Sequence, residues 1–104
     1  MVKTMLLVPV ADNAGEVFGP EDFRELESRL LALGGGFSRQ ANVAGAWAYE
    51  GAVIRDESRQ YLVALQGWRE VAAWLDIVEW ARVRFRQEAI YVEVAGIPEV
   101  LGPK

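Results

Sequence analysis

Residues 37–65, FSRQANVAGAWAYEGAVIRDESRQYLVAL, decide the fold of this chain because they read as two long strands joined by a tight turn. In the first half, Trp47 and Tyr49 share one parity and alternate with alanines, which is the period-two pattern of a strand. Glu50-Gly51 supplies the turn, and the alternation resumes over residues 61–65. The stretch therefore predicts a β-hairpin.

Gly45 interrupts the first of these strands, and it indicates either a β-bulge or the close approach of another backbone. The rings of Trp47, Tyr49 and Tyr61 also leave two placements open. They point into a core beneath helices, or they lie on an uncovered sheet face that a second subunit or a small molecule would fill.

Elements on both sides of the hairpin complete the pattern. The short aliphatic run Lys3–Val10 predicts a first strand that ends near Pro9. A helix is predicted from Pro20, with acidic residues in its first turn, to the glycines at residues 34–36. After the hairpin, residues 68–86 predict a longer helix, and residues 90–94 predict a last strand before a tail that begins at Gly96.

The second helix carries an apolar stripe that should face the core. Its members are Val71, Trp74, Leu75, Val78, Ala81 and Phe85. The resulting order, β-α-β-β-α-β, predicts a ferredoxin-like α+β sandwich in one domain over residues 1–104, with a four-stranded antiparallel sheet and both helices on one face.

Composition limits the chemistry of the chain. It has no histidine and no cysteine, which removes the most versatile catalytic bases, nucleophiles and metal ligands, so we expect no metal and no cofactor. A net charge of −4 disfavours nucleic-acid binding. No apolar stretch reaches membrane-spanning length, so we expect a soluble, cytoplasmic protein without a membrane partner. The absence of cysteine and the excess of arginine over lysine fit a thermophilic source.

The predicted topology gathers polar residues at one edge of the sheet. They are Asp56, Ser58, Arg59, Gln87 and Glu88, approached by the first loop over residues 12–16. In one interpretation, Arg59 binds a small carboxylate or phosphate while Glu88 or Asp56 acts as a base. In the other, Arg59 forms an ion pair with Glu88 or Asp56 and only stabilises the edge.

Three aromatic residues are candidates for an interface with a second copy of the chain: Trp80, Trp47 and Tyr91. Trp80 lies on the outer side of the second helix among apolar neighbours, and tryptophan is enriched where interfaces are tightest. The alternative is that the C-terminal tail, residues 97–101, covers it.

Short motifs in the chain carry a resemblance to a known group of proteins. They are Gly35-Gly36-Phe37, Gly45 with Trp47, Ser58-Arg59 and Gln87-Glu88. The pattern resembles a group of small uncharacterised bacterial and phage proteins. That resemblance implies a ferredoxin-like fold and no established activity, and it singles out the same Ser-Arg and Gln-Glu pairs.

These observations favour a small homodimeric binding or interaction module over an enzyme. The alternative is a cofactor-free enzyme of the dimeric α/β-barrel type that acts on a small organic acid, with Arg59 binding the substrate and Glu88 or Tyr61 moving the proton. A third hypothesis is a regulatory domain that binds a small anionic ligand between subunits.

Overall fold

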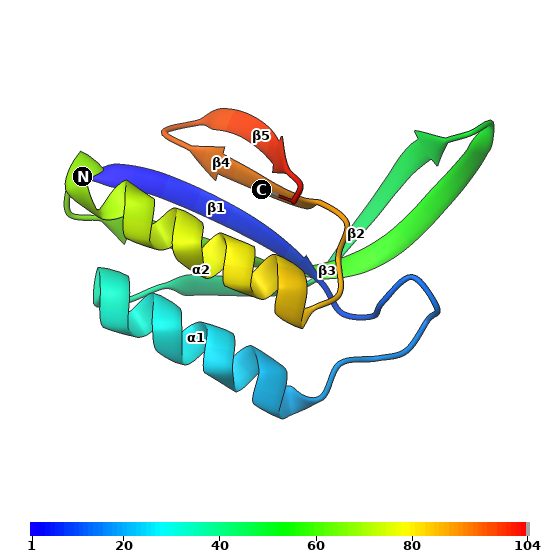
Figure 1. The fold of residues 1–104 in the computed structure, drawn as a ribbon, viewed down its shortest axis with the longest axis horizontal. Coiled ribbons are helices and arrows are strands. Elements are labelled where there is room, and N and C mark those ends of the chain that lie inside the picture. Colours follow the sequence, from blue (N-terminus) through cyan, green and yellow to red (C-terminus); the bar gives the residue numbers. More distant parts are fainter. Residues whose placement is uncertain (104) are drawn as a thin grey trace.

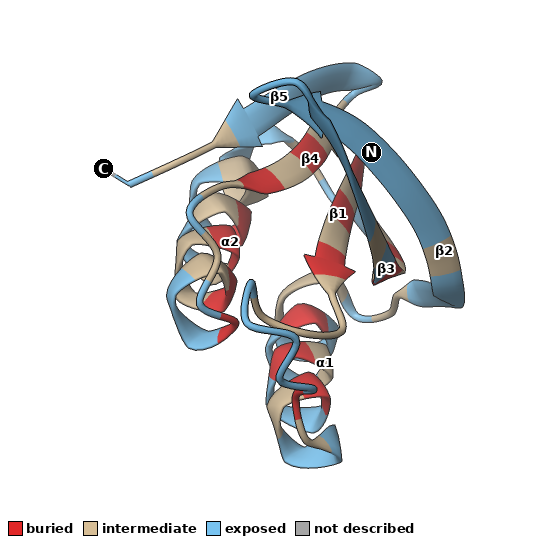
Figure 2. Cartoon of the chain, turned by 90° about the vertical axis from the view of Figure 1, so that its right-hand side faces the viewer, coloured by how far each residue is buried: buried red, intermediate tan, exposed pale blue. Residues whose placement is uncertain are grey.

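The computed structural model describes residues 1–103, which form one five-stranded sheet and two α-helices (Figure 1). The strands are β1 (Val2–Pro9), β2 (Ser38–Tyr49), β3 (Ala52–Leu65), β4 (Ile90–Val94) and β5 (Ile97–Leu101). The helices are α1 (Pro20–Gly34) and α2 (Val71–Arg84), and a 3-10 turn, Trp68–Glu70, precedes α2. The strand order is β2-β3-β1-β4-β5, with every pair antiparallel. Both helices lie side by side against one face of the sheet (Figures 1 and 2).

The predicted four-stranded ferredoxin-like sandwich is wrong, because the expected C-terminal tail forms a fifth strand. β5 pairs with β4 along its whole length through a two-residue turn at Ala95 and Gly96, whose φ angles are 54° and 80°. Alanine seldom adopts a positive φ, so the sequence carries no strong hairpin signal at this turn. Pro98 also argues against a strand, but β5 is an edge strand, where proline is tolerated.

The other predicted elements are confirmed. The hairpin over residues 37–65 forms β2 and β3, and the first helix runs over the predicted range. Four residues of the predicted apolar stripe are buried, three on α2 and one directly after it, and Val71 and Leu75 are partly buried against them. The buried four are Trp74, Val78, Ala81 and Phe85. No helix within residues 1–103 is long and apolar enough to cross a bilayer.

Alternation along β1 separates the two faces of the sheet. Leu6 and Val8 are buried beneath the helices, together with Thr4, whose hydroxyl donates a 2.7 Å hydrogen bond to the Val63 carbonyl. Leu7 points to the opposite face, which no helix covers (Figure 2). We call this second surface the open face.

The β2–β3 hairpin extends beyond the rest of the sheet (Figure 1). We call its outer part, residues 43–57, the arm. It begins after a register shift between Gln40 and Val43, where Asn42 has a φ of 59°. Trp47 and Tyr49 on the arm are 57% and 61% exposed, whereas Tyr61 on the inner part of β3 is fully buried. Tyr61 therefore lies in the core, as one interpretation of the sequence had it, whereas Trp47 and Tyr49 lie outside the core on the arm.

Candidate small-molecule site on the open face

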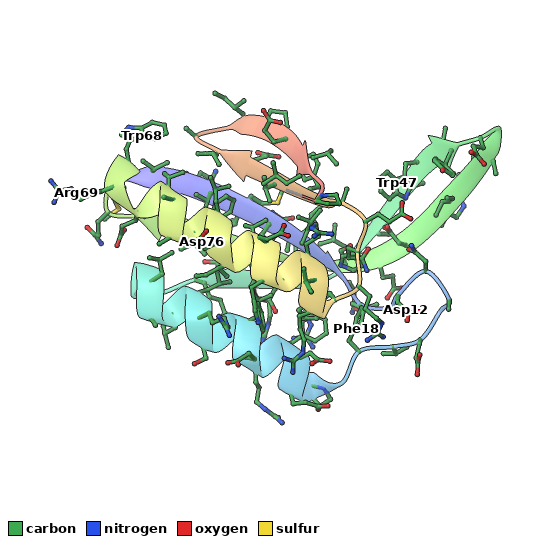
Figure 3. The ribbon with its side chains drawn as sticks, in the orientation of Figure 1. Asp12, Phe18, Trp47, Trp68, Arg69 and Asp76 are labelled. Carbon is green, nitrogen blue, oxygen red and sulfur yellow. The ribbon has the colours of Figure 1, made fainter. Side chains whose placement is uncertain are left out.

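A cavity of about 280 Å³ lies on the open face, between the base of the arm and the β4–β5 hairpin. Its larger side chains are mostly apolar or aromatic: Leu7, Pro9, Trp47, Tyr91 and Val100. Trp47 projects from the side of β2 that faces the rest of the sheet (Figure 3). Three polar side chains join them, from Asp56, Ser58 and Gln87. A largely apolar hollow with a few polar groups is typical of small-molecule sites.

Strand register explains why these residues meet. Pro9 is paired with Ser58, Gly45 with Asp56, and Tyr91 with Val100. Residues directly opposite each other in an antiparallel ladder point to the same face, so each pair contributes two neighbouring groups to the cavity wall.

Gly45 leaves room for the Asp56 side chain, which lies across it. A Cβ on residue 45 would stand 2.9 Å from Oδ1 of Asp56, a distance that real Cβ atoms essentially never show. The close approach that Gly45 indicated is therefore that of a carboxylate rather than of a backbone. The register shift lies earlier in β2, between Gln40 and Val43.

The Gln87 segment is held rigidly at the rim of the cavity. Nε2 of Gln87 donates a 2.7 Å hydrogen bond to the Phe85 carbonyl, and its backbone N–H donates to the Arg82 carbonyl at 2.9 Å. The Arg82 guanidinium in turn donates to the Gln87 carbonyl at 3.1 Å, while a bidentate contact with Glu79 fixes it. The segment is thus positioned by the end of α2.

Tyr91 forms part of the wall that β4 contributes. Its hydroxyl donates a 2.8 Å hydrogen bond to Glu93, and this bond, with partial burial, raises the pKa of the Tyr91 hydroxyl above its ordinary value. The Tyr91 hydroxyl therefore stays uncharged near neutral pH, and the residue contributes an aromatic side chain to the cavity wall.

The structure brings some of the predicted site residues together and separates others. Asp56, Ser58 and Gln87 meet at the cavity, and two of the three predicted interface aromatics, Trp47 and Tyr91, line it as well. Glu88 is adjacent to Gln87 in sequence but is not part of the lining.

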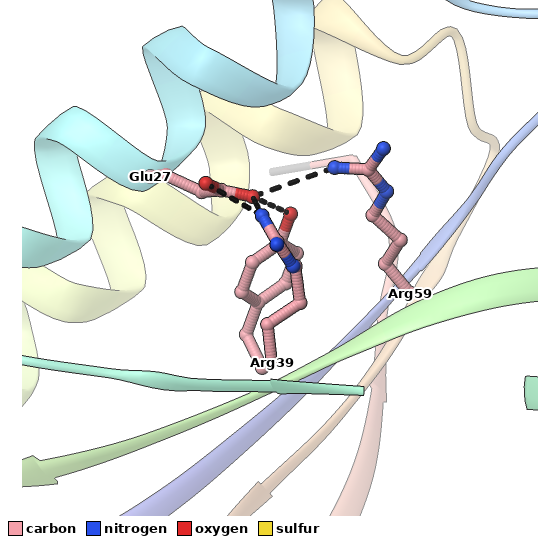
Figure 4. Close-up of polar contacts among 4 residues, drawn as sticks. Glu27, Arg39 and Arg59 are labelled. Carbon is pink, nitrogen blue, oxygen red and sulfur yellow. Dashed lines mark hydrogen bonds and ion pairs between the residues drawn. The ribbon is translucent and has the colours of Figure 1, made fainter. Parts of the chain in front are cut away.

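Arg59 points to the helix-covered side of the sheet, where its partner is Glu27 of α1 rather than Glu88 or Asp56 (Figure 4). One guanidinium nitrogen of Arg59 lies 3.4 Å from the Glu27 carboxylate, and the group stacks 3.9 Å from the centre of the Phe23 ring. Arg39 forms a closer pair with Glu27, at 2.8 Å. This charged cluster connects α1 to β2 and β3.

Tyr61 on β3 is also part of the charged cluster. Its hydroxyl donates a 2.7 Å hydrogen bond to Glu27. Burial raises the pKa of Tyr61 far above its ordinary value, and the hydrogen bond to the Glu27 carboxylate raises it further. Tyr61 therefore stays protonated and acts as a structural donor here.

Trp80 does not line the cavity, and its ring contacts arginine side chains of both helices. The Arg29 guanidinium of α1 lies 4.1 Å from the centre of the Trp80 ring, and that of Arg84 lies 5.8 Å away. β5, which contains residues 97–101, pairs with β4 at the sheet edge. The Trp80 ring thus stabilises the contact between the two helices.

The loop between β1 and α1 is held by Asp12. Its carboxylate accepts 2.9 Å hydrogen bonds from the backbone N–H groups of Ala14 and Glu16, and forms a 3.0 Å ion pair with Arg86. The Glu16 amide is the main cause of a lowered pKa at Asp12, and Arg86 and Ala14 add to it. The Arg86 guanidinium also stacks 4.8 Å from the centre of the Phe18 ring. Figure 3 shows Asp12 and Phe18 close together at this end of the molecule.

Two features of the structure were not predicted. Val100 lines the cavity only because residues 97–101 form β5. The charged cluster on the other side of the sheet depends on the packing of α1, which brings residues 27, 39 and 59 together. Residues 97–101, Ile-Pro-Glu-Val-Leu, show no alternation of apolar and polar residues that would predict a strand. No group of three or more His, Cys, Asp or Glu residues within residues 1–103 is arranged to hold a metal ion.

No known protein family matches the sequence of this chain, and no curated protein does. Among solved structures, the fold is similar to a phage SAM lyase in complex with S-methyl-5′-thioadenosine, with a TM-score of 0.68 and 16% identity over 98% of this chain and 89% of that chain. It is also similar to CutA1 from Oryza sativa, with a TM-score of 0.66 and 13% identity over 98% of this chain and 82% of that one.

A third similar structure is the divalent cation tolerance protein CutA1 from Thermus thermophilus, with a TM-score of 0.57, 15% identity, and coverage of 100% of this chain and 84% of that chain. At these identities the likeness establishes the fold alone. The chain therefore has the fold shared by CutA1 and the phage SAM lyase, in place of the ferredoxin-like sandwich.

Proposed function

We propose that this chain is a single-domain cytoplasmic binding protein that holds a small organic ligand in the cavity on its open face. The cavity itself carries the proposal, because it combines aromatic walls at Trp47 and Tyr91 with three polar groups in one hollow. Its lining within residues 1–103 includes one carboxylate and no lysine or arginine, which favours a neutral ligand over the small anion that the sequence suggested.

The first ligand to test is S-methyl-5′-thioadenosine, because the phage SAM lyase of similar fold is complexed with it. Isothermal titration calorimetry with the purified full chain measures its affinity. We expect saturable binding that Trp47→Ala abolishes or weakens strongly, since it removes an aromatic wall. The absence of heat at ligand concentrations up to ~1 mM, which means a binding free energy weaker than about −4 kcal/mol, would contradict this ligand.

The binding protein is also proposed to self-associate, with the homodimer as its smallest assembly. The arm carries four large apolar side chains that are 43% to 63% exposed: Trp47, Tyr49, Val53 and Ile54. Such a concentration of apolar surface on a small protein is typical of a contact with another protein. A second copy is the partner we propose, because β2 is an edge strand with unpaired backbone groups along the same arm.

Size-exclusion chromatography with light scattering tests the assembly. A homodimer has twice the 11.6 kDa mass of one chain. We expect Tyr49→Ser combined with Val53→Ser to shift the population toward the single chain. Val83→Ser is the matched control, because Val83 is as exposed, at 61%, but lies on α2. A mass of 11.6 kDa at all concentrations would exclude self-association, and a larger multiple would exclude only the dimer.

A cofactor-free enzyme is the second candidate function, and the similarity to a SAM lyase favours it. The organic-acid mechanism suggested by the sequence lacks support, because Arg59 is engaged with Glu27 on the side of the sheet opposite the cavity. Incubation of the protein with SAM, followed by chromatography of the products, separates the two functions. We expect no turnover; release of S-methyl-5′-thioadenosine in proportion to the protein would favour the enzyme.

A further inference from the structure

Two polar side chains of the cavity have no side-chain partner within residues 1–103. Asp56 and Ser58 lie two residues apart on β3, so they point to the same face of the sheet. Ser58 is only 6% exposed. Neither the Asp56 carboxylate nor the Ser58 hydroxyl forms a hydrogen bond or an ion pair with any residue within residues 1–103. Both groups are thus available to a ligand.

Buried polar side chains are nearly always hydrogen-bonded, because leaving one without a partner costs about 1–3 kcal/mol. Within residues 1–103 the only fully buried side-chain polar atom without a partner is Nε1 of Trp74, so the Ser58 hydroxyl keeps contact with solvent at the cavity. Ser58 is buried between its neighbours on adjacent strands, Pro9 and Val43, neither of which offers a polar side chain. Only solvent or a ligand in the cavity can satisfy its hydroxyl.

The position of the carboxylate is set by Gly45. Because residue 45 has no side chain, Oδ1 of Asp56 lies over the backbone of β2, in the space that a Cβ would fill. Any larger residue at position 45 would push the carboxylate away. Gly45 is therefore a positioning residue for Asp56.

Together the two groups define the chemistry of a complementary ligand. A carboxylate only accepts hydrogen bonds, and a hydroxyl both donates and accepts, so the pair calls for a ligand group with two adjacent O–H donors. A vicinal diol has this form, and carboxylates bind the hydroxyls of a ribose in this way in dinucleotide sites. The neighbouring Trp47 and Tyr91 rings supply apolar and aromatic surface for a planar base beside it.

We infer that Asp56 and Ser58 form a subsite for the vicinal hydroxyls of a neutral nucleoside-type ligand, with Gly45 positioning the carboxylate. This inference rests on the proposed function, because it assigns a ligand class to the same cavity. It goes further in naming which residues select the ligand and which part of the ligand they recognise.

The experiment compares S-methyl-5′-thioadenosine with its 2′,3′-dideoxy analogue, which lacks both hydroxyls, by calorimetry on the full chain. We expect the analogue to bind the unmodified protein about tenfold more weakly or worse. Asp56→Ala should remove this preference, and Ser58→Ala should reduce it. Glu57→Ala is the matched control: it deletes a carboxylate from the same strand, but one that alternation directs to the opposite face. Circular dichroism confirms that each variant is folded.

The possible results separate the two proposals. Binding of both ligands with equal affinity would overturn the diol subsite and leave the binding function standing. A preference that survives Asp56→Ala would also overturn the subsite. Failure of the unmodified protein to bind either ligand would overturn the proposed ligand and the subsite with it.

Discussion

Gly45 and Asp56 face each other across the ladder between β2 and β3, and the Asp56 carboxylate occupies the space where a side chain at residue 45 would begin. The two residues come from different strands, so the hairpin register alone sets this contact. A shift of one residue would turn Asp56 away from the cavity. The site therefore depends on the same register that forms the fold.

Gly45→Ala is expected to weaken ligand binding more than it weakens the fold. The added Cβ would stand 2.9 Å from Oδ1 of Asp56, so the carboxylate must move, whereas the backbone needs no adjustment because Gly45 has an ordinary φ. We expect about a tenfold loss of affinity for S-methyl-5′-thioadenosine, with a loss of unfolding free energy below about 1 kcal/mol.

Gly67→Ala is the control for that substitution, because a Cβ at residue 67 would meet no atom within 4 Å. Calorimetry and urea denaturation measure the two effects separately. If Gly45→Ala binds as well as the unmodified protein, the Asp56 carboxylate is not positioned for binding.

Arg59→Ala tests whether Arg59 has a structural role, through its pair with Glu27, and no role in ligand binding. Arg59 is paired with Glu27 and stacked on Phe23, so its loss should lower the free energy of unfolding by about 1 kcal/mol while ligand affinity stays unchanged. Arg55→Ala is the control, because Arg55 lies on the exposed arm of the same strand. A loss of ligand binding without a loss of stability would contradict this prediction and would mean that Arg59 takes part in ligand binding.

The hairpin and both helices were predictable from sequence because each is encoded locally, by alternation over residues 37–65 and by apolar spacing along α1 and α2. The fifth strand was not, because its turn places Ala95 at a φ of 54° and its second residue is Pro98. Neither feature is a hairpin signal, and the strand depends on contacts distant from its own sequence pattern: pairing with β4 and packing of Leu101 against the core.

The candidate site was predictable where it depends on strand parity and not where it depends on helix docking. Asp56 and Ser58 share a face by alternation, and the topology brings Gln87 to the same end of the sheet. Arg59 follows the opposite parity, which already separates it from Ser58. Its partner Glu27 was not predictable, because the two residues are 32 positions apart in the sequence and meet only when α1 packs against the sheet.

Tyr61→Phe is expected to cost about 1 kcal/mol of unfolding free energy at pH 7, because Glu27 loses one hydrogen bond but keeps its pair with Arg39. The pKa of Tyr61 is raised in the folded state, so the unfolded chain loses this proton first. Stability from the protonated hydroxyl is therefore present below the unfolded pKa, about 10, and declines as the pH rises above it.

Urea denaturation of the unmodified protein and of Tyr61→Phe at several values between pH 8 and pH 11 measures this contribution. The difference in stability between them should shrink, and then reverse, above about pH 10. A constant difference across the range would mean that the Tyr61 hydroxyl does not titrate differently in the folded state.

Asp12→Asn is expected to lower the stability of the fold at neutral pH, and this effect should disappear in acid rather than in alkali. Because the Glu16 amide, Arg86 and Ala14 lower the pKa of Asp12, its ionised form favours the folded state. This contribution is present above the ordinary pKa of 3.8 and is lost as the pH falls below it. The variant should therefore melt at a lower temperature than the unmodified protein at pH 7, and the two melting temperatures should converge toward about pH 2.5.

Glu57→Gln is the control for Asp12→Asn, because the Glu57 carboxylate has no ion pair within residues 1–103. It should melt like the unmodified protein at both pH values. If Glu57→Gln also melts at a lower temperature than the unmodified protein at pH 7, and this difference also disappears in acid, then the overall charge of the chain determines how stability changes with pH. The Asp12 contacts between the first loop and the end of α2 would then have no specific part in it.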